Sequence, residues 1–244
     1  MTPPGRRLPR RIAQLLIGLF LYGVGIAFIL RGEIGSAPWD VLSQGVTRHV
    51  PLSFGLVTIL ISILVLLLWL PLRQRYGIGT LANALLVGPS ADVGLMLIPE
   101  GQPLWLRIIF FAAGLLILAM ATGLYIGAHF GPGPRDGLMT GLHRRTGWPI
   151  WIVRTGLEVT VVVLGWLLGG VAGVGTVVFA LAVGPLCQFF LRIFDLKMPD
   201  ASAPVAGLVD ADADTGPLAL DDDEDRPQQP QRQLREEGEA ERIE

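Results

Sequence analysis

Two similar loops carry the acids of this sequence that are best placed to do chemistry, Asp40 and Asp136. Residues 35–40 read GSAPWD and residues 131–136 read GPGPRD. Proline suits the first turn of a helix, and the positive end of the helix dipole favours an acid two residues later. One interpretation is that the acids cap two short helices. The other is that both helix starts enter an apolar interior and face a path for a solute. The second loop does not favour a phosphate cradle, because Pro132 and Pro134 lack the N–H groups that such a cradle needs.

A Gly-Pro step recurs in two apolar runs, as Gly88-Pro89 and Gly184-Pro185. Proline removes an N–H group and clashes with the preceding helical turn. A helix broken at these steps would leave free carbonyls and helix ends that bind a solute or an ion. The alternative is a kink that packing tolerates.

Charged or amide side chains also lie within the apolar runs. Asp92 and Gln188 follow the two Gly-Pro steps. A carboxyl in hydrocarbon must face a cavity or a partner, unless it is close enough to the end of its run to reach the surface. Arg154 and Glu158 are four residues apart and therefore share a helix face. This ion pair either lines a pathway or locks two helices together.

Signatures of catalysis and of metal binding are absent from the sequence. Its single cysteine and three scattered histidines form no zinc-type cluster. The sequence contains no His-Glu-x-x-His, Gly-x-Ser-x-Gly or Walker motif. We therefore expect no enzyme activity, no cofactor and no metal, and an intramembrane enzyme is the weakest hypothesis.

Long uncharged segments must position these residues. Hydrophobic residues make up 51% of the 244-residue chain. They fall in runs of about 18 residues or more, enough to cross roughly 30 Å of hydrocarbon as helices. Segments 36–49 and 134–146 are too short and polar to span, and we predict re-entrant or interfacial helices there. The fold class predicted is an all-α, polytopic transmembrane bundle with six spans, at 12–30, 50–72, 76–98, 105–128, 148–168 and 174–194.

The sequence repeats itself at an offset of 96 residues. Identical Gly, Pro, Asp and Thr residues at one fixed offset are stronger evidence than apolar matches, which are common between membrane helices. Each half, 12–98 and 105–196, holds three spans. Because three is odd, the second half must enter the membrane from the opposite side, which predicts inverted repeats of the kind found in secondary transporters. The matches include Gly35, Pro38, Asp40, Gly45 and Arg48 with Gly131, Pro134, Asp136, Gly141 and Arg144, and Gly77, Gly79, Thr80, Gly88 and Pro89 with Gly173, Gly175, Thr176, Gly184 and Pro185.

The distribution of basic residues predicts the orientation. If both termini are cytoplasmic, basic residues on the inside greatly outnumber those outside, as the positive-inside rule requires. We therefore predict a bacterial inner or plasma membrane protein surrounded by the lipid bilayer, with no nucleic-acid partner; a homo-oligomer is compatible with the sequence. The inside set is Arg6, Arg7, Arg10, Arg11, Arg73, Arg75, Arg135, Arg144, Arg145, Arg192 and Lys197, and the outside set is Arg31, Arg48 and Arg107.

The composition changes at both ends of the chain. Residues 1–11 form a basic cytoplasmic leader rich in proline and arginine. Residues 199–244 are rich in acids, proline and glutamine, and 221–225 read DDDED. Such a segment cannot bury enough apolar surface to fold, so we predict a disordered acidic cytoplasmic tail. It is either a passive solvated tail or a segment that binds a partner.

Several motifs together resemble the YczE-like bacterial membrane proteins, within a wider group that includes YyaS and YitT. The resemblance covers roughly residues 10–196 and implies a multi-pass bacterial membrane protein of a group often described as permeases, with no assigned substrate and no catalytic residue. The motifs are Gly35-x-x-Pro-Trp-Asp40, Gly77-x-Gly-Thr80, Gly131-x-Gly-Pro-Arg-Asp-Gly137, Arg144-Arg-Thr-Gly-Trp148, Gly165-Trp-Leu-Leu-Gly-Gly170 and Gly173-x-Gly-Thr176.

The sequence therefore favours a secondary transporter, or a permease or exporter, of an unknown small polar or charged metabolite. The alternative is a non-transporting membrane scaffold or sensor that acts through its acidic tail. Deleting residues 199–244 separates the two, because only the scaffold depends on the tail.

Reporter fusions test the predicted topology. A topology reporter joined after Arg48 should read as periplasmic, and one joined after Arg144 should read as cytoplasmic, because the two positions are equivalent in halves of opposite orientation. Alkaline phosphatase and fluorescent-protein activities in whole cells measure this directly. Reporters that read on the same side would contradict the inverted repeat.

Overall fold

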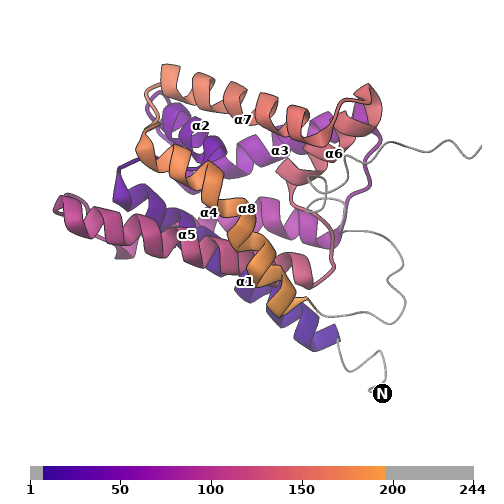
Figure 1. The fold of residues 1–244 in the computed structure, drawn as a ribbon, viewed down its shortest axis with the longest axis horizontal. Helices are drawn as coiled ribbons and strands as arrows, with labels where there is room; N and C mark the ends of the chain where they lie inside the picture. Colours follow the sequence, from indigo (N-terminus) through magenta and orange to yellow (C-terminus); the bar gives the residue numbers. More distant parts are fainter. Residues whose placement is uncertain (1–7, 196–244) are drawn as a thin grey trace, which may run out of the picture. The chain divides into compact units, whose positions relative to one another are not determined.

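The computed structural model describes residues 8–195, and this part of the chain is entirely helical (Figure 1). Helix α1 begins at Leu8, so the predicted leader 1–11 overlaps its first turn. The predicted acidic tail lies outside the described residues. The helices are α1 (Leu8–Gly32), α2 (Pro38–Thr47), α3 (Phe54–Leu72), α4 (Ile78–Leu97), α5 (Leu104–Gly127), α6 (Pro134–Thr146), α7 (Ile150–Leu167) and α8 (Val174–Phe194).

Six of these helices, all except α2 and α6, are long and apolar enough to cross a membrane. Helices α2 and α6 have 10 and 13 residues, too few to span. The predicted all-α fold with six spans and two short helices is therefore confirmed. Leucine, isoleucine and valine side chains are exposed along the outer faces of the spans, and Trp105, Trp148, Trp151 and Trp166 are exposed near helix ends. Tryptophan favours this position because its ring suits the membrane–water interface.

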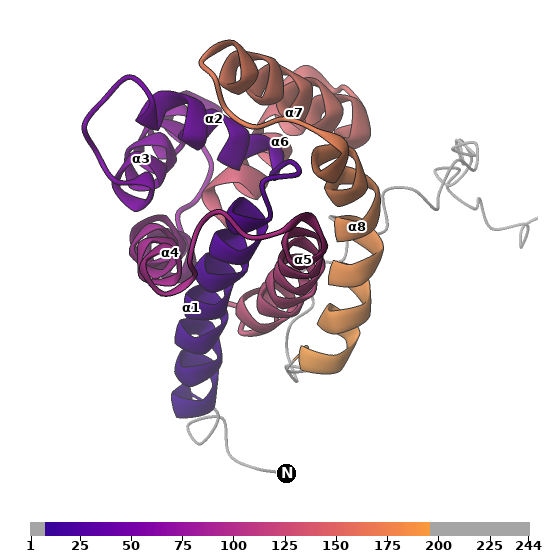
Figure 2. The ribbon, with the colours of Figure 1, turned by 90° about the vertical axis from the view of Figure 1, so that its left-hand side faces the viewer.

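The helices of the second half follow those of the first in the same order. Helices α2 and α6 begin at Pro38 and Pro134, and α4 and α8 begin at Ile78 and Val174, in each case 96 residues apart. The first helices of the two halves, α1 and α5, pack side by side along much of their length (Figure 2). Gly18 lies against Tyr125 whereas Gly25 lies against Leu118, so the equivalent helices α1 and α5 run antiparallel.

Two arginines form hydrogen bonds to backbone carbonyls at the two ends of this helix pair. The Arg11 Nε on α1 donates to the Ala128 carbonyl after the end of α5, at 3.0 Å. The Arg107 Nε on α5 donates to the Gly32 carbonyl at the end of α1, at 3.1 Å. Each guanidinium satisfies a carbonyl that the helix leaves free and places a cation at the negative end of the dipole. Arg11 and Arg107 are 96 residues apart, so the two bonds are equivalent.

The halves are intertwined through their loops. The Gly79 N–H at the start of α4 donates to the Phe130 carbonyl, at 2.9 Å, and the Gly175 N–H at the start of α8 donates to the Ile34 carbonyl, at 2.8 Å. A Cβ atom on Gly77 would lie 2.3 Å from the Phe130 carbonyl oxygen, so only glycine permits this docking. Helix α2 likewise packs on α7, and α6 packs on α3. Each half therefore completes the packing of the other.

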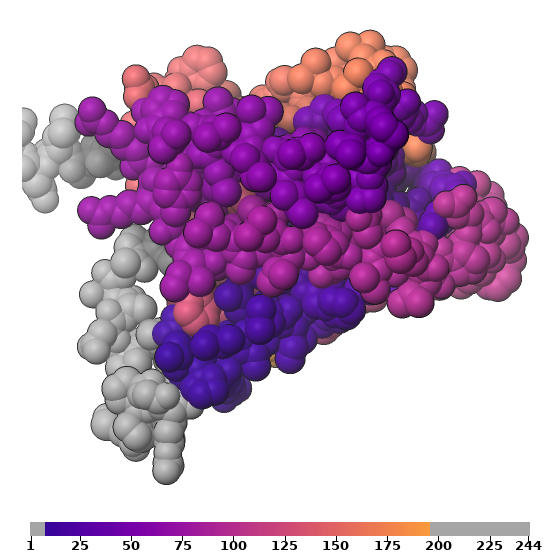
Figure 3. Space-filling view, turned by 180° about the vertical axis from the view of Figure 1, so that it is seen from behind, coloured from indigo at the N-terminus to yellow at the C-terminus, as the bar shows by residue number. Residues whose placement is uncertain are grey.

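One helix pair breaks the equivalence. Helices α3 and α4 pack tightly, since a Cβ atom on Gly88 would lie 2.3 Å from the Gly55 carbonyl oxygen. The space-filling view from behind shows α3 and α4 lying against each other (Figure 3). The equivalent helices α7 and α8 do not pack along each other. A Cβ atom on Gly184, the counterpart of Gly88, would meet nothing within 4 Å.

The Gly-Pro steps do not break their helices. Helix α4 continues through Pro89, and α8 continues through Pro185. The prediction of a broken helix with free ends is therefore wrong, and the tolerated-proline alternative describes the fold. A single proline removes one helical hydrogen bond, which the remaining bonds of a long helix tolerate.

The two glycines of these steps provide a matched pair of substitutions. We expect Gly88→Ala to destabilise the protein by about 1–3 kcal/mol, because the added methyl group overpacks the α3–α4 contact. Gly184→Ala should leave the stability unchanged or raise it by up to about 1 kcal/mol, because its site is open and alanine favours the helix more than glycine does. Unfolding in mixed micelles with increasing denaturing detergent measures both. Equal costs for the two variants would contradict the asymmetry.

Candidate functional site

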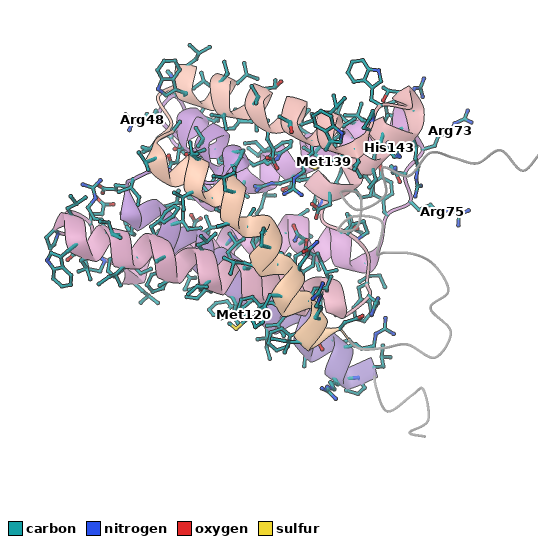
Figure 4. All side chains as sticks on the ribbon, in the orientation of Figure 1. Arg48, Arg73, Arg75, Met120, Met139 and His143 are labelled. Atoms are coloured by element: carbon teal, nitrogen blue, oxygen red, sulfur yellow. The ribbon has the colours of Figure 1, made fainter. Side chains whose placement is uncertain are left out.

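The two short helices begin face to face inside the bundle. Asp40, in the first turn of α2, lies 3.4 Å from Arg135, in the first turn of α6. From there the helices lead to opposite ends of the molecule, where Figure 4 shows Arg48 just after α2 and His143 near the end of α6. Their positive dipole ends therefore converge in the interior, where they favour the two carboxylates Asp40 and Asp136.

Asp40 is the most deeply buried acid at this meeting point. Its side chain is 1% exposed, and that of Arg135 is 19% exposed. Asp40 makes no capping bond at the start of α2. Its Oδ1 accepts from both Arg135 Nη groups, at 3.4 and 3.5 Å. Asp40 Oδ2 is buried with no hydrogen-bond partner among the described residues. The guanidinium of Arg135 also lies 5.5 Å from the centre of the Trp39 ring, a cation–π contact.

Asp136 has a different environment, although it occupies the equivalent position. Its Oδ2 accepts a hydrogen bond from the Tyr125 hydroxyl on α5, at 3.2 Å. The Tyr125 ring packs edge-to-face with Tyr22 on α1, with ring centres 5.9 Å apart. The two halves thus place one acid against an arginine and the other against a pair of tyrosines.

Burial acts on both carboxyls, which lie outside the six spans. Burial raises the pKa of Asp40, and the charge and hydrogen bonds of Arg135 oppose that rise. Burial also raises the pKa of Asp136, opposed by the charge of Arg154, the Tyr125 hydrogen bond and the charge of Arg135. Each acid therefore depends on nearby cations to remain ionised.

A small pocket opens beside Asp136. Residues of both halves line it, and most are polar, so it suits a small polar solute. The lining residues are Tyr22, Thr58, Ser62, Asn83, Val87, Tyr125, Gly133, Pro134, Arg135 and Asp136.

Asp92 lies on α4, away from this pocket, and its side chain contacts the start of α3. Its carboxylate accepts hydrogen bonds from the Ser53 hydroxyl, at 2.6 Å, and from the Gly55 N–H, at 2.7 Å. These bonds fasten α4 to the first turn of α3 and favour the positive end of that helix. Gln188, its counterpart on α8, is half-buried. The structure therefore does not bring the Gly88-Pro89 and Asp92 region into the same site as Asp136.

Arg154 and Glu158 form the predicted pair along α7. The Arg154 Nε lies 3.1 Å from the Glu158 Oε1, and the two side chains are 48% and 25% exposed. Arg154 lies close enough to Asp136 for its charge to favour the ionised carboxylate. The pair does not line the pocket itself.

Sequence reasoning missed most of the pocket. Arg135 was visible within GPGPRD, but nothing in the sequence indicated that it pairs with an acid 95 residues away. Thr58 and Ser62 are the uncharged counterparts of Arg154 and Glu158. Asn83 is an amide within an apolar run. A search for polar side chains along each span would have found these three, although not their convergence.

The fold and this interior define a polytopic helical membrane protein with a polar pocket between its two halves. The chain belongs to a family of unknown function, DUF6198, whose family model matches residues 9–192.

Three relatives agree with this assignment and with the predicted resemblance. An uncharacterised protein of Haemophilus influenzae is 41% identical over 184 residues, which cover 75% of this chain and 84% of that protein. The uncharacterised membrane protein YczE of Bacillus subtilis is 32% identical, over 71% of this chain and 82% of that protein. YyaS of the same organism is 25% identical, over 73% and 91%. No solved structure matches the chain.

The buried ion pair predicts a stability effect. Arg135→Met should destabilise the protein by about 3–5 kcal/mol, because it leaves the Asp40 carboxylate buried without its cation. Adding Asp40→Asn to Arg135→Met should recover much of this loss. Arg75→Gln removes a positive charge from an exposed side chain that points outward (Figure 4), so its cost should stay within about 0.5 kcal/mol. Denaturant titrations of five proteins measure these differences: the unaltered protein, Arg135→Met, Asp40→Asn, the double variant and Arg75→Gln. Additive costs for the two site substitutions would contradict the pairing.

Proposed function

We propose that this protein is a secondary transporter, or permease, of a small polar solute, and that its two halves alternate between two packings around the pocket. The packing asymmetry between the halves carries the proposal. Equivalent helices α3 and α4 are packed together while α7 and α8 are apart. Two halves of the same design in different packings are what alternating access requires, since exchanging the packings would open the other side.

The geometry of the repeats supports inverted orientation. Equivalent helices α1 and α5 run antiparallel, and the bonds of Arg11 and Arg107 repeat one another across them. A two-fold relation in the membrane plane would produce both features. With both termini cytoplasmic in a bacterial inner or plasma membrane, Arg73 and Arg75 would lie inside and Arg48 outside. Figure 4 shows Arg48 at the opposite end of the molecule from Arg73 and Arg75.

The position of the pocket supports a solute pathway. It lies where the starts of the two short helices meet, and it is lined by hydroxyl, amide and charged groups within a bundle of apolar spans. Ionisable residues at such depth are costly and therefore usually serve transport, signalling or a structural pairing. The Asp40–Arg135 pair can serve the structure, but Asp136 has no arginine of its own at hydrogen-bond distance among the described residues.

Transport by purified protein tests the proposal. Proteoliposomes containing the full chain are loaded with a bacterial small-metabolite extract, and the solutes that leave are identified by mass spectrometry against protein-free liposomes. We expect at least one small polar solute to leave faster, and we expect Asp136→Asn to slow it by roughly tenfold or more through loss of a charged contact. Asp40→Asn should also impair transport, because it frees Arg135.

The control is Glu100→Gln, which removes the same charge from a side chain that is 74% exposed; its rate should stay within about twofold of the unaltered protein. A chain without residues 199–244 should also transport. The proposal fails if no solute crosses faster than in protein-free liposomes. A cellular phenotype that requires only the tail would favour the scaffold or sensor alternative.

A further inference from the structure

The charges around the pocket leave one carboxylate unmatched. Asp40 and Arg135 pair at 3.4 Å, and Arg154 and Glu158 pair at 3.1 Å. Each pair cancels its own charge. Asp136 remains, with hydrogen bonds from the Tyr125 hydroxyl at 3.2 Å and from the Gly133 backbone, and with no arginine of its own at hydrogen-bond distance among the described residues. When Asp136 is ionised, the side chains at this point therefore carry one negative charge beyond what their own arginines neutralise, and the positive ends of α2 and α6 offset that charge only in part.

An anion is a poor fit to this pocket. Arg135 is its only lining cation among the described residues, and the Asp40 carboxylate already occupies that guanidinium while the Trp39 ring lies against it. An anion would have to share Arg135 with Asp40 and also lie beside Asp136. A neutral solute would leave an ionised Asp136 without an added cation, which is costly in a low-dielectric interior.

The rest of the lining suits an ammonium group. Tyr22 and Tyr125 contribute two rings to the wall, and aromatic faces attract cations. Thr58, Ser62 and Asn83 contribute oxygen atoms that can accept N–H hydrogen bonds. A carboxylate, two aromatic rings and several acceptor oxygens are the groups that recognise a protonated amine.

We propose that the pocket binds a small organic ammonium ion, with its positive group against Asp136 and the ring of Tyr125 or Tyr22. This assignment rests on the proposed function and names the chemical class of its solute. Asp136 is the residue that sets charge selectivity, and the Asp40–Arg135 pair holds the helix starts in place.

Three probes of similar size test the assignment on the unaltered full chain. Propylammonium, propanol and propionate are titrated into the detergent-solubilised protein at constant ionic strength, and binding is followed by calorimetry and by thermal stabilisation. We expect propylammonium to bind at least tenfold more tightly than propanol or propionate, as expected for one charged contact. Asp136→Asn should remove that preference, Asp136→Glu should retain most of it, and Glu100→Gln should leave it unchanged.

The comparison of the three probes does not depend on any variant, so it decides the question even if Asp136→Asn fails to fold. Equal or tighter binding of propanol or propionate would overturn the assignment, as would binding of none of the three. In those cases, solute movement in the proteoliposome experiment would show that the transport proposal stands with a different class of solute. If propylammonium binds but no solute is transported, the assignment of the binding site stands and the proposed transport function is wrong.

Discussion

The buried contact between Asp40 and Arg135 is the constraint on which the rest of this structure depends. A carboxylate with 1% exposure in an apolar bundle needs a cation, and the cation comes from the other half of the chain. This pairing holds the first turns of α2 and α6 together inside the protein. The loops that precede these helices then dock on the starts of α8 and α4 through backbone hydrogen bonds. The pocket exists because two helix starts meet there instead of apolar side chains.

The equivalence of the two halves is clear in the backbone and is broken by side-chain size. Trp69 on α3 packs on Gly137 of α6, where a Cβ atom would lie 2.0 Å from its ring, and its Nε1 donates to the Pro134 carbonyl at 3.0 Å. At the equivalent contact the sizes are exchanged, because Gly165 of α7 lies against Val41 of α2. The larger residue therefore lies on the spanning helix α3 at one contact and on the short helix α2 at the equivalent contact. Such differences allow two halves with one backbone design to adopt different packings.

Much of this architecture was predictable from the sequence, because hydrocarbon imposes long apolar runs and a repeat shows itself at a fixed offset. The short helices α2 and α6 were predicted from their polar composition, and the pairing of Arg154 with Glu158 was predicted from their spacing. The breaks at Pro89 and Pro185 were not borne out, because a proline removes only one hydrogen bond and both helices continue through it. The pocket could not be predicted, because it depends on the approach of Tyr22, Asn83 and Asp136 from three different helices. Spacing along one helix does not report such convergence.

Distances between helices in a bilayer test the exchange of packings most directly. Spin labels at Leu56 and Leu85 report on α3 and α4, and labels at the equivalent positions Ile152 and Leu181 report on α7 and α8; all four side chains are exposed, and Cys187 is replaced by serine. Pulsed electron paramagnetic resonance in liposomes, over a range of pH and with added solutes, measures both pairs. The account predicts two distances for each pair of labels. Conditions that lengthen the distance between positions 56 and 85 should shorten the distance between positions 152 and 181. One unchanging distance in both pairs under every condition would contradict it.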